Sequence, residues 1–442
     1  MNKQDLNTRI IAIKIIQEVL IHNRPFKATN VKYLKNTDLS SLDINFITEL
    51  VKGTIRMYKR LSHEASCYYH GKFHKLEKLY VIILNLAVYQ IRYMSNVPDY
   101  AIVSTSVEIT KKFFTKYSKI TNGLLRNMIS DKTCLRKPNE NDSTDYISIY
   151  YSHPKWLVGK WHKKYDFNSL IKLLEYNNDK PQIWFRHSIN ITNLSIYSEN
   201  KKIDLIIHPY LNNFFTVKKT SSLINHESIS KGNISVQSPT NGLIVKLLNP
   251  KSGDTIIDLC AAPGGKTIAI SDYMLNSGKI YAYDINAKRI ELIKENIKKN
   301  KISNIKVELK DSSKDKIHKA SKMIADVPCL GTGTICKNAD LRWKKNLNDL
   351  YKLINLQESI LNNSSRYLKP NGIIVYSTCS IEEEENWMVI DRFLEKHPNY
   401  IVDNASRYVD SIYTDARGAI NIKPQIHGID GGFAVRLINY ES

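Results

Sequence analysis

Two cysteines lie in short motifs that are candidates for covalent chemistry. Cys329 ends the motif DVPC, and Cys379 is the third residue of the motif STCS. A single cysteine is usually a buried structural thiol. In a loop beside a ligand site, however, a thiolate acts as a covalent nucleophile when a nearby cation or helix dipole stabilises it. The two cysteines are therefore candidate catalytic residues.

Three aspartates, Asp284, Asp311 and Asp326, end or closely follow successive predicted strands. An aspartate in such a place is often only a helix cap or a turn residue. Asp284, however, follows Gly264 by 20 residues, the spacing at which an acidic side chain accepts hydrogen bonds from a ribose. Because the carboxyl ends of parallel strands meet at one edge of a sheet, we expect the three carboxylates to surround one ligand.

The stretch 254–267, DTIIDLCAAPGGKT, predicts a buried strand, a turn of small residues and a helix that begins near Lys266. The first N–H groups of such a helix point toward a ligand. A Walker A loop is absent, because Cys260 stands where its first glycine is needed, and the dinucleotide pattern GxGxxG is absent too. The alternative is a turn without a ligand. Together with the aspartates, the stretch favours a cofactor with an adenosine-like ribose and little phosphate, such as S-adenosylmethionine.

Alternating strands and helices from residue 234 onward predict a doubly wound, mainly parallel sheet, and hence an α/β fold for residues 236–442. The strand at 433–439 is expected to be an antiparallel edge strand. The helices that precede and connect the first strands are expected at 236–248 and 287–300. The parallel strands are expected at 254–260, 278–285, 305–311, 322–329 and 372–380.

Residues 1–135 predict a helical domain, since apolar residues recur there at helical spacing. Residues 1–130 hold 20 lysines and arginines against 9 acidic residues, which fits an RNA-contacting bundle or a solvated basic surface. A polar linker at 136–145 leads to a small α/β module at 145–235, with a helix at 153–165 and a strand at 181–191. The helices of the first domain are expected at 9–21, 46–58, 79–94, 103–114 and 121–129.

The 442-residue chain has a net charge of +21 and a pI near 9.4, which favours a polyanionic partner such as nucleic acid or an anionic membrane surface. No apolar run reaches the 18 residues of a membrane span, and the first residues do not resemble a signal peptide, so we expect a cytoplasmic protein. Six cysteines are too few for a disulfide scaffold, and none has a typical zinc spacing. We therefore expect reduced thiols and no metal site.

The C-terminal half resembles the RNA 5-methylcytosine methyltransferases of the Sun/RsmB-like family. The N-terminal region resembles the NusB-like helical RNA-binding domain of RsmB-type members, through GTIR, PDYAIVSTSVEI and NGLLRN. This resemblance implies a Rossmann-like class I methyltransferase sheet and small-subunit (16S) ribosomal RNA as substrate. The motifs of the C-terminal half, between Val236 and Leu437, are VQSPTNG, DLCAAPGGKT, YAYDIN, DVPCLGTGTICKNADLRW, LQESIL, YSTCSIEEEEN and DGGFAVRL.

The resemblance also implies a role for each site residue. Asp284 would bind the ribose, Asp311 would lie near the adenine, and Asp326 would lie near both cofactor and target base. Cys379 would add to C6 of cytosine as the nucleophile, and Cys329 would assist product release. The residues that would wrap the cofactor are Cys260, Ala261, Ala262, Pro263, Gly264, Gly265 and Lys266.

Two other functions remain open at this point. The first is a catalytically silent RNA-binding or ribosome-assembly factor on the same fold, which the high positive charge would suit. The second is a methyltransferase that acts on another atom, such as an adenine nitrogen. That chemistry typically uses an Asn/Asp-Pro-Pro-aromatic motif, whereas this chain has Asp326-Val327-Pro328-Cys329. The sequence favours cytosine C5 as the target.

Overall fold

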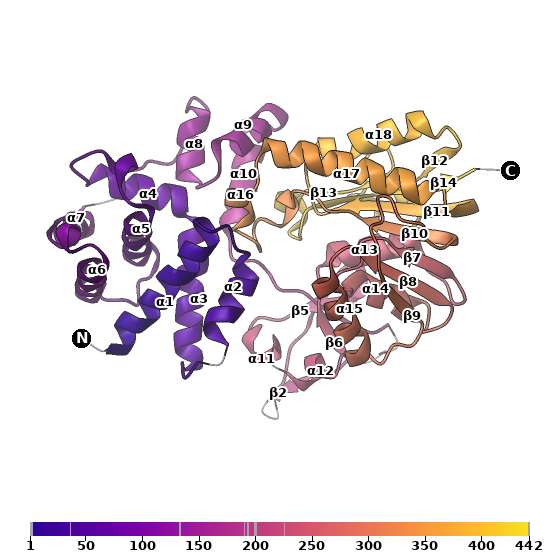
Figure 1. The fold of residues 1–442 in the computed structure, drawn as a ribbon, viewed down its shortest axis with the longest axis horizontal. Coiled ribbons are helices and arrows are strands. Elements are labelled where there is room, and N and C mark those ends of the chain that lie inside the picture. Colours follow the sequence, from indigo (N-terminus) through magenta and orange to yellow (C-terminus); the bar gives the residue numbers. More distant parts are fainter. Residues whose placement is uncertain are drawn as a thin grey trace. The chain divides into compact units, whose positions relative to one another are not determined.

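The computed structural model describes residues 3–35, 37–131, 134–189, 191, 194–198, 201–224 and 226–440. The chain forms two compact units (Figure 1). The first comprises residues 1–179 together with 335–345, and the second comprises residues 180–334 and 346–442. No helix in the described part of the chain is long and apolar enough to cross a membrane.

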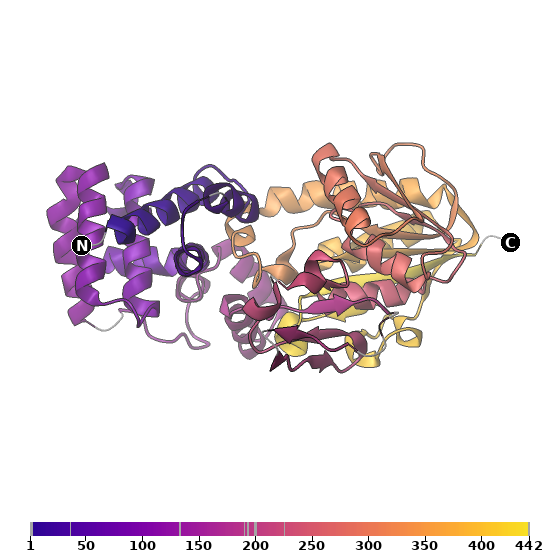
Figure 2. The ribbon, with the colours of Figure 1, turned by 90° about the horizontal axis from the view of Figure 1, so that it is seen from below.

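The N-terminal part of the first unit is helical, as predicted for residues 1–135, and Figure 2 gives a second view of its helices. Helix α5 is apolar on all faces, which is typical of a fully buried helix, and residues 80–90 are all buried. It packs against α1, α3, α4, α6 and α7. The helices of this region are α1 (Lys3–Leu20), α2 (Phe26–Leu34), α3 (Ser41–Arg56), α4 (Tyr58–Cys67), α5 (Lys78–Tyr93), α6 (Asp99–Phe113) and α7 (Ser118–Ser130).

The segment 335–345, which contains α16 (Leu341–Lys344), belongs to the first unit although its sequence neighbours belong to the second. The guanidinium of Arg342 is buried and donates hydrogen bonds to the carbonyl oxygens of Ser152 and Asn177, each at 2.9 Å. Burial lowers the pKa of Arg342 to about 9. The same unit also contains α8 (Thr144–Tyr150), α9 (Lys155–Lys164) and α10 (Phe167–Asn178).

The large sheet of the second unit has the strand order β12-β14-β11-β10-β7-β8-β9, and β13 pairs with β14. Strands β11, β10, β7, β8 and β9 are parallel, which confirms the predicted doubly wound core. The order reverses at β7, whose neighbours are β10 and β8. The strands are β7 (Thr255–Asp258), β8 (Lys279–Asp284), β9 (Ile305–Leu309), β10 (Ala320–Asp326), β11 (Leu368–Thr378), β12 (Tyr400–Asp403), β13 (Ile420–Ile422) and β14 (Gly432–Asn439).

The prediction that residues 433–439 form an edge strand is wrong. Strand β14 is antiparallel, as expected, but it lies between β11 and β12 and pairs with both. Seven of its eight residues are buried, because β14 lies inside a sheet that helices cover on both faces. Strand β12, which was not predicted, is the edge strand at this end of the sheet.

Helices cover both faces of the sheet (Figure 1). Helix α13 packs on β11, β14 and β10, whereas α17 packs on β10 and β11 from the other side, beside α18. Alternation along β11 shows the two faces: Val375 joins the core that contains α13, and the hydroxyl of Tyr376 points to Gln357 of α17. The helices are α13 (Pro239–Leu248), α14 (Gly265–Tyr273), α15 (Ala287–Lys299), α17 (Leu347–Ser365), α18 (Trp387–Lys396) and α19 (Pro424–His427).

A smaller antiparallel sheet, ordered β4-β5-β1-β6, precedes the large one in the second unit. Its strand β1 is much shorter than the predicted strand 181–191. Arg186 of β1 forms a buried ion pair of 2.6 Å with Asp272 of α14, which anchors this sheet to the large one. The strands of this sheet are β1 (Phe185–His187), β4 (Ile206–His208), β5 (Leu211–Thr216) and β6 (Ile234–Val236). The same region contains a separate two-stranded sheet of β2 (Tyr197–Ser198) and β3 (Lys201–Lys202), and the helices α11 (Ser221–Ile224) and α12 (Glu227–Ser230).

The division into three domains at 135, 145 and 235 stays a prediction.

Candidate active site

The turn between β7 and α14 holds its backbone in a curled loop at the carboxyl edge of the sheet. Gly264 caps α14 with a φ of +100°, a conformation that side chains other than glycine rarely adopt. Its N–H donates to the carbonyl oxygen of Ala261 at 2.6 Å, and Asn296 of α15 donates to the carbonyl oxygen of Pro263 at 2.9 Å. The loop is therefore fixed from two sides, and its small side chains let a ligand approach the backbone.

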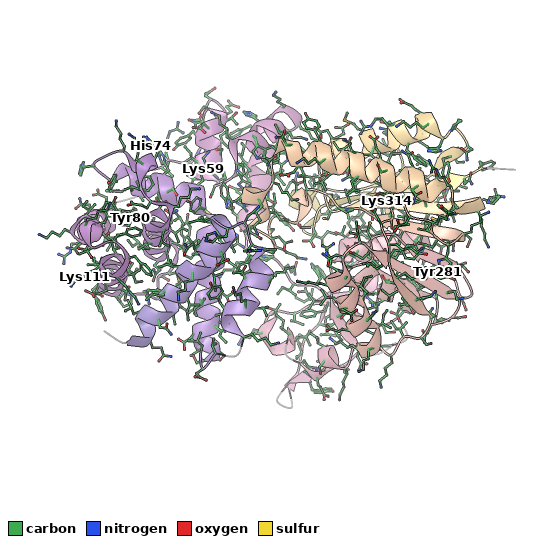
Figure 3. All side chains as sticks on the ribbon, in the orientation of Figure 1. Lys59, His74, Tyr80, Lys111, Tyr281 and Lys314 are labelled. Atoms are coloured by element: carbon green, nitrogen blue, oxygen red, sulfur yellow. The ribbon has the colours of Figure 1, made fainter. Side chains whose placement is uncertain are left out.

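The polar groups around this loop fit an adenosine-bearing cofactor better than a phosphate. The buried carboxylate of Asp284 accepts hydrogen bonds from the N–H groups of Ala262 (3.3 Å) and Asn286 (2.9 Å). A carboxylate has about four lone-pair positions, so it can also accept ribose hydroxyls. The carboxylate of Asp311 lies 3.4 Å from the ammonium of Lys314, which is labelled in Figure 3. Lys266, the lysine of the turn, is paired with the carboxylate of Asp326, so its charge is already neutralised and is a poor partner for a phosphate.

Asp258, the last residue of β7, is a buried carboxyl beneath the same loop. Its Oδ2 accepts a hydrogen bond of 2.7 Å from the hydroxyl of Thr267. Burial raises the pKa of Asp258 to about 7, and the nearby Asp326 carboxylate adds to the effect. At neutral pH this carboxyl is therefore close to half protonated, and its ionised form costs folding free energy.

Asp258→Asn is expected to increase the free energy of unfolding more at pH 8 than at pH 4. The pKa of Asp258 is raised on folding, so the folded state holds the proton longer, and the native protein loses stability as the pH rises from about 4 to about 7. Each pH unit between the two pKa values costs about 1.4 kcal/mol, and the amide avoids this cost. Urea unfolding of both proteins at pH 4 and pH 8 measures the difference, with the exposed Glu291→Gln as the control. An equal effect at both pH values would contradict the raised pKa.

Lys266 and Asp326 form an ion pair of 2.6 Å between the start of α14 and the end of β10. The second carboxylate oxygen of Asp326 accepts from the hydroxyl of Ser377 at 2.9 Å. Burial opposes the charge of Lys266, but the Asp326 carboxylate and its hydrogen bond raise the pKa of this ammonium, and Cys379 adds to the effect. Lys266 is therefore a cation whose charge acts on Cys379.

Cys329 and Cys379 lie side by side, with their sulfur atoms 3.2 Å apart. The two come from the loops after β10 and β11, which are neighbours in the sheet. The hydrogen bond with Cys379 and burial together raise the pKa of Cys329 well above its usual value. Cys329 is therefore a thiol at neutral pH, whereas the exposed Cys379 lies next to an ammonium group. The two thiols therefore differ in their surroundings, and the exposed Cys379 is the more accessible of the two.

The remaining cysteines differ from this pair. Burial, followed by the charge of Asp258, raises the pKa of Cys260 well above its usual value, so this thiol is unreactive. Cys336 is buried in the first unit, and Cys67 and Cys134 also belong to that unit. The turn at 260–266 and the aspartates Asp284, Asp311 and Asp326 all lie at the carboxyl edge of the large sheet.

Residues 245–438 match the family model described as 16S rRNA methyltransferase RsmB/F, and residues 6–130 match the NusB family. Residues 245–438 therefore form a methyltransferase domain of the RsmB/F kind, and residues 6–130 form a NusB domain. This enzyme family uses S-adenosylmethionine, the cofactor predicted from the turn and the three carboxylates.

Relatives match over nearly the whole chain. The "Probable ribosomal RNA small subunit methyltransferase B" of Bacillus subtilis is 28% identical and covers 90% of this chain and 91% of its own length. The "Ribosomal RNA small subunit methyltransferase B" of Photorhabdus laumondii is also 28% identical and covers 98% and 99%. Among solved structures, the crystal structure of PH0851 covers 99% of both chains with a TM-score of 0.80 and 23% identity. NSun6 from Pyrococcus horikoshii with SFG covers 65% of this chain and 99% of its own, with a TM-score of 0.57 and 19% identity. These two structures support the fold.

A buried polar cluster supports the Cys329 loop of this methyltransferase. Oε1 of Glu385 accepts hydrogen bonds from the N–H of Leu330 (2.9 Å) and from Nε2 of Gln357 (3.0 Å). Nε2 of Gln357 also donates to the carbonyl oxygen of Pro328 at 2.9 Å, and the hydroxyl of Tyr376 donates to the carbonyl oxygen of Glu385 at 2.6 Å. Burial raises the pKa of Glu385. The cluster fixes the backbone on both sides of Cys329.

Glycines bring the two cysteine loops and the start of β14 together. A Cβ on Gly333 would lie 2.3 Å from the carbonyl oxygen of Gly431, so only glycine permits this approach. The N–H of Gly333 donates to the carbonyl oxygen of Cys379 at 3.0 Å, and the N–H of Gly431 donates to the carbonyl oxygen of Gly333 at 2.8 Å. Neither glycine contact nor the Glu385 cluster was predicted from the sequence.

Glu385→Ala is expected to destabilise the enzyme by about 2–4 kcal/mol, because it opens a cavity and leaves two buried N–H donors unpaired. The turnover rate should fall at least tenfold, since the Cys329 loop loses its support. Glu385→Gln keeps the volume and an acceptor oxygen, and it imitates the protonated acid that burial favours, so it should rescue most of both losses. Urea unfolding and methyl-transfer kinetics measure the two effects, with the exposed Glu383→Ala as the control. If glutamine is as harmful as alanine, Glu385 does not act by accepting these bonds.

Proposed function

We propose that this enzyme methylates C5 of a cytosine in small-subunit (16S) ribosomal RNA through a covalent bond between Cys379 and C6. The observation that carries the proposal is the pair of sulfur atoms, 3.2 Å apart, beside the ion pair of Lys266 and Asp326. C5 of cytosine is a poor nucleophile. A thiolate that adds to C6 turns C5 into an enamine-like carbon, which explains the use of a cysteine here.

In the first step the sulfur of Cys379 forms a bond to C6, the thiol proton ends on N3 of the base, and the N3–H then donates to a carboxylate oxygen of Asp326. The ammonium of Lys266 meanwhile pairs with the Asp326 carboxylate. Each carboxylate oxygen of Asp326 accepts one hydrogen bond from the protein and retains a second lone pair for the base. The target base must leave its stack to reach these groups.

S-adenosylmethionine supplies an electrophilic methyl group when it is bound at the turn. The turn residues 260–266 with Asp284 and Asp311 would hold this donor, and C5 of the adduct would accept its methyl group. Because Asp284 is buried and the loop is fixed, these groups are already ordered before the cofactor binds, so binding costs them little conformational entropy. The proposal thus assigns these residues to binding and orientation.

In the last step Cys329 gives its own proton to solvent and takes the proton from C5. The electrons of the C5–H bond form the C5–C6 double bond again, and the sulfur of Cys379 leaves C6. The largest cause of the raised pKa of Cys329 is its hydrogen bond with Cys379. Once the sulfur of Cys379 is bonded to carbon, this cause of the raised pKa is removed, and Cys329 ionises more readily. Formation of the bond between Cys379 and C6 therefore makes it easier for Cys329 to act as the base in the next step.

RNA as the substrate is supported by charge and by the relatives. The chain carries +21, and the NusB region holds about half of this excess. Relatives that align over nearly all of the chain carry the name ribosomal RNA small subunit methyltransferase B. The proposal places the enzyme in the cytoplasm with the ribosomal subunits.

A silent RNA-binding factor would have no use for this arrangement. A protein that only binds RNA does not need two adjacent cysteines, one protonated and one beside an ammonium group. The experiment that separates the functions is methyl transfer from labelled S-adenosylmethionine to unmodified small-subunit ribosomal RNA, followed by digestion to nucleosides. We expect the label in 5-methylcytidine. Label in a methylated adenosine, or RNA binding without label, would refute the proposal.

A further inference from the structure

A second group of soft donor atoms lies in the helical unit, outside the methyltransferase region. His63 and Cys67 are four residues apart on α4 and therefore share one face of the helix. Cys134, in the segment after α7, brings its sulfur to 2.7 Å from that of Cys67. A donor nitrogen of His63 and the two sulfur atoms all lie within 4.8 Å of one another.

These distances fit three ligands around one cation. At a zinc–sulfur distance of about 2.3 Å and a zinc–nitrogen distance of about 2.0 Å, tetrahedral ligands lie about 3.5–3.8 Å apart. The sulfur atoms need to separate by about 1 Å to reach this spacing. Both cysteines are exposed, so their side chains can rotate by that amount without repacking a core. Thiolate and imidazole donors select zinc-like cations over calcium or magnesium.

A disulfide is the competing product of the same two sulfur atoms. It would leave His63 without a role, although the helix presents the imidazole to the same point. In a reducing compartment, moreover, paired cysteines serve as metal ligands or redox groups more often than as structural disulfides. The imidazole therefore favours a metal.

We propose that His63, Cys67 and Cys134 bind one zinc ion, with water in the fourth position. The ion ties the end of α4 to the segment after α7, two parts of the chain separated by 67 residues. Because the site exists only in the folded state, zinc stabilises the helical unit by mass action. This inference is independent of the proposed methylation chemistry.

Cobalt titration of the reduced, metal-free, full-length protein tests the site, since zinc itself has no absorption. We expect one equivalent of Co²⁺ to produce a thiolate-to-cobalt charge-transfer band and tetrahedral ligand-field bands, and zinc to displace them. Cys67→Ser and Cys134→Ser should lose the bands, and His63→Gln should weaken binding at least tenfold. His74→Gln, at the exposed histidine labelled in Figure 3, is the matched control and should bind like the wild type.

Three results would overturn the inference. The first is no stoichiometric binding by the wild type, and the second is unchanged binding by Cys67→Ser. The third is a signal that disappears in Cys329→Ala, which would assign the metal to the other cysteine pair. Peptide mapping after alkylation of the protein in cell extracts adds a fourth check, because a Cys67–Cys134 disulfide in that sample would replace the metal. Thermal unfolding in the presence of chelator confirms that each variant folds, which is expected because the substituted side chains are not in the core.

Discussion

Cys379→Ala is expected to reduce methyl transfer to RNA by more than about 10³-fold, the size of loss that follows removal of a catalytic nucleophile. Without the sulfur, no bond to C6 forms and C5 stays unreactive. S-adenosylmethionine should bind as before, because the turn at 260–266 and Asp284 do not depend on this side chain. Cys379 is exposed, so its truncation leaves no cavity in the core.

Single-turnover methyl transfer and cofactor binding by calorimetry measure the two parts of this prediction. Cys336→Ala is the matched control, since it removes a thiol that lies in the helical unit and should retain activity within a few-fold. Activity in Cys379→Ala within tenfold of the wild type would eliminate Cys379 as the nucleophile. A loss of cofactor binding equal to the loss of activity would show instead that the substitution damages the turn.

Cys329→Ala is expected to accumulate a covalent complex between protein and RNA. The charge of Lys266 still acts on Cys379 in this variant, and Cys379 loses only the sulfur atom 3.2 Å from its own, so addition to C6 and methyl transfer proceed. The proton on C5 then has no base within reach, and the bond to Cys379 persists. Turnover should fall by about 10²–10⁴-fold, the usual contribution of a general acid or base.

Denaturing electrophoresis of the reaction shows the complex as a band that carries both protein and labelled RNA. The band should be absent from the wild type after turnover and from the double variant Cys329→Ala/Cys379→Ala. A Cys329→Ala enzyme that turns over slowly without such a band would assign Cys329 a role before the addition step. The Glu385→Ala variant should show a weaker form of the same trapping, because it loosens the loop that positions Cys329.

The sequence was sufficient for the parts of the site that depend on local pattern. The strand, small-residue turn and helix at 254–267 form as predicted, and the alternation of strands and helices correctly placed Asp284, Asp326, Cys329 and Cys379 at one edge. Parallel strands make this possible, because their carboxyl ends must meet. The pairing of Lys266 with Asp326 could also have been predicted, because β7 and β10 are neighbours in the sheet.

Contacts between segments that are distant in the sequence could not be predicted from local patterns. Glu385 lies in a run of four glutamates that reads as a solvated surface, yet its side chain is buried under the Cys329 loop. The edge strand β12 is four residues long and has no alternating pattern, so β14 appeared to be the edge. The spacing of His63 and Cys67 gave no metal signal by itself, because the third donor, Cys134, arrives only through folding.

The covalent bond to Cys379 is the central claim, and a mechanism-based trap tests it most directly. RNA that contains 5-fluorocytosine at the target position can be attacked and methylated, but fluorine at C5 cannot leave as a proton, so the adduct is permanent. After incubation with S-adenosylmethionine and digestion, mass spectrometry of the peptides should find the nucleotide on the peptide that contains Cys379. A nucleotide on the Cys329 peptide, or an unmodified protein after RNA methylation has been demonstrated, would contradict the account.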